Sequence, residues 1–138
     1  MPTVPAPHPM TSSLDAIAVI LALLDHEPET TLAALVDGLP DGGRAVLPVR
    51  GGDPGPAGAT GLAACLAKAL PPGGGLRVVL LSVRAGAGDA PAEADLAAWR
   101  ALDRSGGARY ELLDWFVVTD DTILSLAELA GPPARWLG

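Results

Sequence analysis

The chain has 138 residues, enough for one hydrophobic core but not two, and it is 49% hydrophobic and 18% charged, as is typical of a globular protein. Its net charge of −7 and nine scattered basic residues argue against a non-specific nucleic-acid binder, because phosphate contacts need clustered Lys or Arg. The single cysteine, Cys65, excludes a disulfide framework and a thiolate metal site.

The first half of the chain predicts a helix and a hairpin. Residues 1–10 contain four prolines, so we expect a disordered arm ahead of a single domain over residues 11–138. Ser12 or Ser13 can cap a helix that runs to about Asp25. Its apolar residues at helical spacing predict a core-facing stripe of Leu14, Ile17, Leu21 and Leu24. Strands are expected over 31–37 and 44–49, on either side of a turn at 38–43 that is rich in Pro, Asp and Gly.

The second half predicts alternating helices and strands. After a loop over 51–58, a helix should cover 60–70, and we interpret Cys65 within it as a small core residue because Leu62 and Leu66 are its neighbours. The remaining elements expected are a strand over 76–81, a helix over 92–103 and strands over 112–118 and 123–126. This order predicts an α/β fold with a mixed sheet flanked by helices.

Nothing in the sequence indicates export or membrane insertion. No basic residue precedes the apolar stretch 16–24, whose nine residues fall short of the roughly 20 that cross a bilayer. We therefore expect a cytoplasmic protein with no membrane partner.

Two segments carry the most specific pattern in the chain. Residues 78–96 read VVLLSVRAGAGDAPAEADL, and residues 112–121 read LLDWFVVTDD, with SLAE at 125–128. Together with the strand ends at Asp37 and Gly51, they resemble the RadC-like branch of the JAB/MPN (JAMM) family, whose second segment is LLDHxIVGDGxxxSLxE. The resemblance covers roughly residues 12–130. It implies a three-layer MPN-like fold, which is also the fold of cytidine deaminases.

The same resemblance places a zinc site on residues that cannot form one. The family's His-x-His, Ser and Asp fall on Ser82, Arg84, Ala92 and Asp95, so only the Asp is retained. A neutral Ser is a poor zinc ligand, an Arg is a permanent cation, and Ala92 lacks a donor for an oxyanion. Glu29 matches the position of the general base but would have no zinc-bound water to activate. We therefore expect no catalytic residue, no metal and no cofactor, although the family uses zinc.

Other interpretations of these residues stay open. Asp95 would be stabilised in a first helical turn whatever its ancestry, and Glu29 suits a solvated loop. A metal site rebuilt from His8 and His26 is a remote alternative, as is anion binding at residues 86–89. The three tryptophans, Trp99, Trp115 and Trp136, are interpreted as packing residues.

A sharper hypothesis joins the charged residues of this site. Arg84 would take the electrostatic role of the zinc by pairing with Asp95 and with Glu29, because two carboxylates in an emptied cavity would repel each other.

The residues thus predict a non-catalytic RadC-like domain that acts as a protein-interaction or scaffold module. Its partner would be an unknown protein or, in a homodimer, a second copy. The alternative is the working zinc-dependent metalloprotease or isopeptidase that the resemblance implies. A DNA-repair-associated protein is the weaker alternative, because the chain is acidic.

Overall fold

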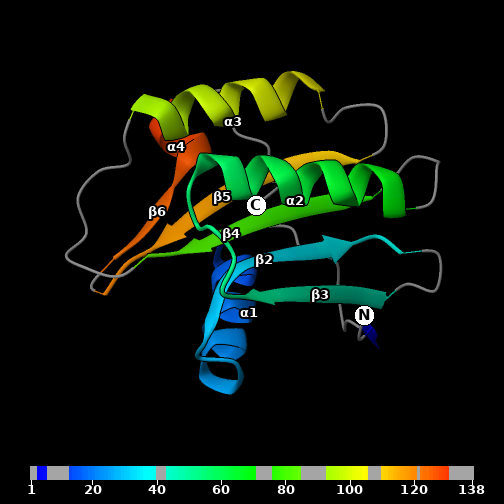
Figure 1. Cartoon of the computed structure of the whole chain (residues 1–138). Helices are drawn as coiled ribbons and strands as arrows, with labels where there is room; N and C mark the ends of the chain where they lie inside the picture. Colours follow the sequence, from blue (N-terminus) through cyan, green and yellow to red (C-terminus); the bar gives the residue numbers. More distant parts are fainter. Residues whose placement is uncertain are drawn as a thin grey trace.

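A mixed β-sheet lies between two layers of helices (Figure 1). The computed structural model describes residues 3–5, 13–39, 43–70, 76–84, 93–105, 110–120 and 122–130. Across these residues the sheet has six strands in the order β1-β3-β2-β4-β5-β6. The β4–β5 pair is parallel and the other neighbouring pairs are antiparallel. The predicted α/β class, with a mixed sheet flanked by helices, is therefore confirmed.

Most elements begin and end close to their predicted positions. In chain order they are β1 (Thr3–Pro5), α1 (Ser13–His26), β2 (Thr30–Asp37), β3 (Gly43–Arg50), α2 (Pro56–Ala69), β4 (Arg77–Val83), α3 (Glu93–Ser105), β5 (Glu111–Val118), β6 (Ile123–Ser125) and α4 (Leu126–Ala130). α2 begins earlier than predicted because Pro56 suits the first turn of a helix, where its fixed φ fits and its missing N–H costs no bond.

Helices α2, α3 and α4 pack on one face of the sheet (Figure 1). The core on this side includes Leu66 of α2, Trp99 of α3, Leu126 of α4 and Trp115 of β5. The hydroxyl of Tyr110, which is buried just before β5, donates to the carbonyl of Ala63 in α2 over 3.1 Å. This side of the sheet carries the candidate site.

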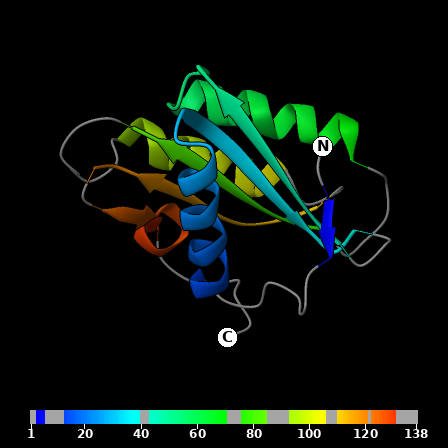
Figure 2. The same ribbon diagram turned by 90° about the horizontal axis from the view of Figure 1, so that it is seen from below.

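Helix α1 covers the opposite face (Figure 2), and the stripe predicted on it is confirmed only at Ile17 and Leu24, which are partly buried against the core on this side. Leu14 and Leu21 are 75% and 55% exposed, whereas Ala16 and Ile20 are fully buried against the sheet. Apolar residues occur almost all round this helix, so their spacing does not single out one face. The small side chain of Ala16 suits close packing of the helix on the strands.

The interpretation of Cys65 as a core residue is also wrong, because its side chain is exposed. The buried face of α2 consists of Ala59, Leu62, Ala63 and Leu66. Successive helical residues are turned by about 100°, so Cys65 points away from the face that Leu66 buries.

Both ends of the described chain differ from the prediction. Thr3–Pro5, expected within a disordered arm, form β1 and pair with Gly43–Ala45 of β3. Near the C-terminus the strand expected over 123–126 stops at Ser125, and α4 follows it. The Ser125 hydroxyl accepts the backbone N–H of Glu128 over 3.1 Å, as in the Ser-x-x-Glu pattern at helix starts.

Buried Asp114 of β5 secures the same turn. Its carboxylate accepts the Ser125 hydroxyl over 2.6 Å and the backbone N–H of Ala127 over 3.1 Å. The aspartate of LLDW therefore supports the start of α4. Among the helices of the described residues, none is long and apolar enough to span a membrane.

Candidate functional site

The end of β4 places Ser82 and Arg84 on the same side of the sheet, because alternate residues of a strand share a face. Ser82 is fully buried. The backbone N–H of Arg84 donates to the carbonyl of Val118 over 2.8 Å, which extends the β4–β5 ladder by one residue. The Arg84 backbone is therefore held at the sheet, and its side chain projects toward α3.

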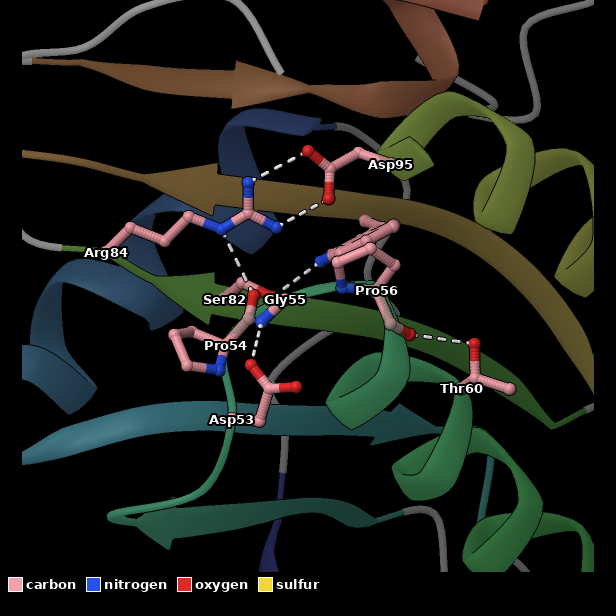
Figure 3. Close-up of polar contacts among 9 residues, drawn as sticks. Asp53, Pro54, Gly55, Pro56, Thr60, Ser82, Arg84 and Asp95 are labelled. Carbon is pink, nitrogen blue, oxygen red and sulfur yellow. Dashed lines mark hydrogen bonds and ion pairs between the residues drawn. The ribbon is translucent and has the colours of Figure 1, made fainter. Parts of the chain in front are cut away.

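Arg84 forms a bidentate ion pair with Asp95 (Figure 3). Its Nη1 and Nη2 donate to Oδ2 and Oδ1 of Asp95 over 3.0 and 2.7 Å. The Arg84 side chain is 24% exposed and that of Asp95 only 3%. Parallel N–H···O bonds between ionised groups are among the stronger hydrogen bonds in proteins. The predicted pairing of Arg84 with Asp95 is confirmed.

The position of Asp95 adds a second stabilising term. It lies in the first turn of α3, where the partial positive charge of the helix N-terminus favours a carboxylate. The helix dipole and the Arg84 guanidinium therefore act together on this buried anion. The simpler interpretation of Asp95 as an acid in a first helical turn is correct as far as it goes, but it leaves out the guanidinium.

A loop carbonyl accepts a third hydrogen bond from the guanidinium of Arg84. Nε of Arg84 donates to the carbonyl of Pro54 over 3.1 Å (Figure 3). Pro54 lies in the loop between β3 and α2, where the Asp53 carboxylate accepts the backbone N–H of Gly55 over 2.8 Å. Arg84 thus connects the end of β4 to α3 and to this loop.

Gly58 allows the loop to lie close to α2. A Cβ at this position would be 1.7 Å from the Asp53 carbonyl oxygen, whereas real Cβ atoms essentially never come within 3.0 Å of another atom. Nothing in the sequence indicated that the Pro54 carbonyl would belong to the site, because a backbone acceptor has no residue signature. Gly58 gave no signal either, because it lies in the predicted loop 51–58, where a glycine is ordinary.

Buried Trp115 lies beneath the ion pair, and its predicted burial is confirmed. The indole Nε1 donates to the Ser82 hydroxyl over 2.8 Å, and Cζ of Arg84 lies 6.0 Å from the centroid of the ring. At this distance the cation is attracted to the face of the ring. Trp99 is buried as predicted, and Trp136 lies outside the described residues.

Glu29 is placed elsewhere, so the predicted contact of Glu29 with Arg84 is not formed. It is exposed in the turn before β2, and its charge acts on Arg50. Glu27 forms a hydrogen bond and an ion pair with Arg50, and this contact is the main reason why the pKa of the Arg50 guanidinium is raised. The charge of Glu29 raises it further. This exposed pair is distinct from the site at Arg84.

Of the remaining predicted positions, the structure describes only His26. His26 is exposed at the end of α1. Ala92, His8 and the segment 86–89 lie outside the described residues.

The residues at the end of β4 do not fit a zinc ion. Zinc in proteins is bound by Cys, His, Asp or Glu side chains. Ser82 offers only a neutral hydroxyl, which accepts the Trp115 indole N–H, and Arg84 has no acceptor atom. Within the described ranges, no group of three His, Cys, Asp or Glu side chains lies together. The arrangement can hold a helix, a strand and a loop in a fixed relation, but it offers no nucleophile beside a base.

Comparisons of the chain with known protein families, curated proteins and solved structures find no match. Its function is therefore inferred from the site and from the resemblance carried by residues 78–96 and 112–128.

Proposed function

We propose that this chain is a non-catalytic JAB/MPN-like domain of the RadC-like type that acts through contacts with a partner protein. Its MPN-like fold would be retained while the zinc chemistry is lost. Arg84 and Asp95, which the resemblance aligns with the metal site, serve as a structural link instead.

The Arg84–Asp95 ion pair is the observation that carries this proposal. Asp95 stands at the position of the one retained ligand, and both of its carboxylate oxygens accept N–H groups of Arg84. A zinc ion at this carboxylate would have to displace the guanidinium and would then lie beside a permanent cation. Such a cation repels a metal ion and cannot ligate it.

An activity assay tests the proposal against the zinc-protease alternative. Purified protein is supplied with zinc and a fluorogenic substrate whose scissile bond is a lysine isopeptide, and Asp95→Ala serves as the matched control. We expect turnover to be absent from both proteins. Turnover by the wild-type protein that a chelator abolishes and Asp95→Ala lacks would overturn the proposal.

A further inference from the structure

We draw no further inference here: the strongest candidate, the exposed apolar surface patch around Leu14 and Leu21 on α1, carries no proposal because nothing in the described part of the chain shows what covers it.

Discussion

Replacing Arg84 with Met removes the guanidinium and keeps a similar unbranched stem. The variant leaves the Asp95 carboxylate, which is 3% exposed, without its bidentate partner, and it frees the Pro54 carbonyl. Removing one member of a buried ion pair costs about 3–5 kcal/mol because the other charge stays buried. Arg84 is itself 24% exposed, so water can reach part of the site, and we expect a loss near the lower figure, about 3 kcal/mol.

Urea unfolding, followed by tryptophan fluorescence and by circular dichroism, measures this loss of stability. The slope of the unfolding free energy against urea concentration should be the same in the variant and the wild type. Arg50→Met is the matched control, because Arg50 pairs with Glu27 at the surface and is 63% exposed; it should change stability little. Arg84→Met combined with Asp95→Asn should be more stable than Arg84→Met alone, since the unpaired charge is then gone. A loss below about 1 kcal/mol for Arg84→Met, the range of an exposed pair, would refute the reasoning.

Three further predictions concern other positions. Gly58→Ala should lower the stability by about 1–3 kcal/mol, because its Cβ would meet the Asp53 carbonyl. Gly61→Ala, at an open position of the same helix, should raise the stability by up to about 1 kcal/mol. Similar urea midpoints for the two variants would contradict this. Burial raises the pKa of Tyr110, so the folded state holds the phenolic proton more tightly than the unfolded state. Its contribution to stability is complete below the unfolded pKa of about 10 and is lost as pH rises through the folded pKa. The stability of the wild type and of Tyr110→Phe is measured as the pH is raised above about 10. This decline in stability should occur in the wild type alone, and a parallel decline in Tyr110→Phe would contradict the contribution of Tyr110. Cys65 should react with a thiol reagent in the native protein, and reaction only after unfolding would contradict its exposure.

Strands β2, β4 and β5 were predictable because each is an apolar run bounded by turn residues. β2, β4 and β5 are buried along most of their length and follow or precede Gly, Pro or Asp. The buried face of α1 was not predictable in this way, since Leu14 and Leu21 are as apolar as Ile20. Only the position of the sheet selects Ala16 and Ile20. The start of α4 had a local signal in Ser125 and Glu128, but the short apolar run 123–126 also suits a strand.

For the site, the sequence predicts the chemistry of single residues better than their partners. The pairing of Arg84 with Asp95 was predicted because the resemblance places both residues at one site, where a cation would stabilise the retained carboxylate. The burial of Trp115 was equally plain, but its hydrogen bond to Ser82 depends on the register of β4 against β5. Glu29 shows the limit of positional matching, since its distance along the chain suited a general base although it is exposed in the turn before β2.

The zinc content of the protein tests the central claim, that Arg84 replaces a metal ion at Asp95. Wild-type protein and Asp95→Ala are produced in zinc-supplemented medium and measured by elemental analysis after exhaustive washing. We predict zinc far below one equivalent per chain in both proteins. Stoichiometric zinc in the wild type, lost in Asp95→Ala, would contradict the claim.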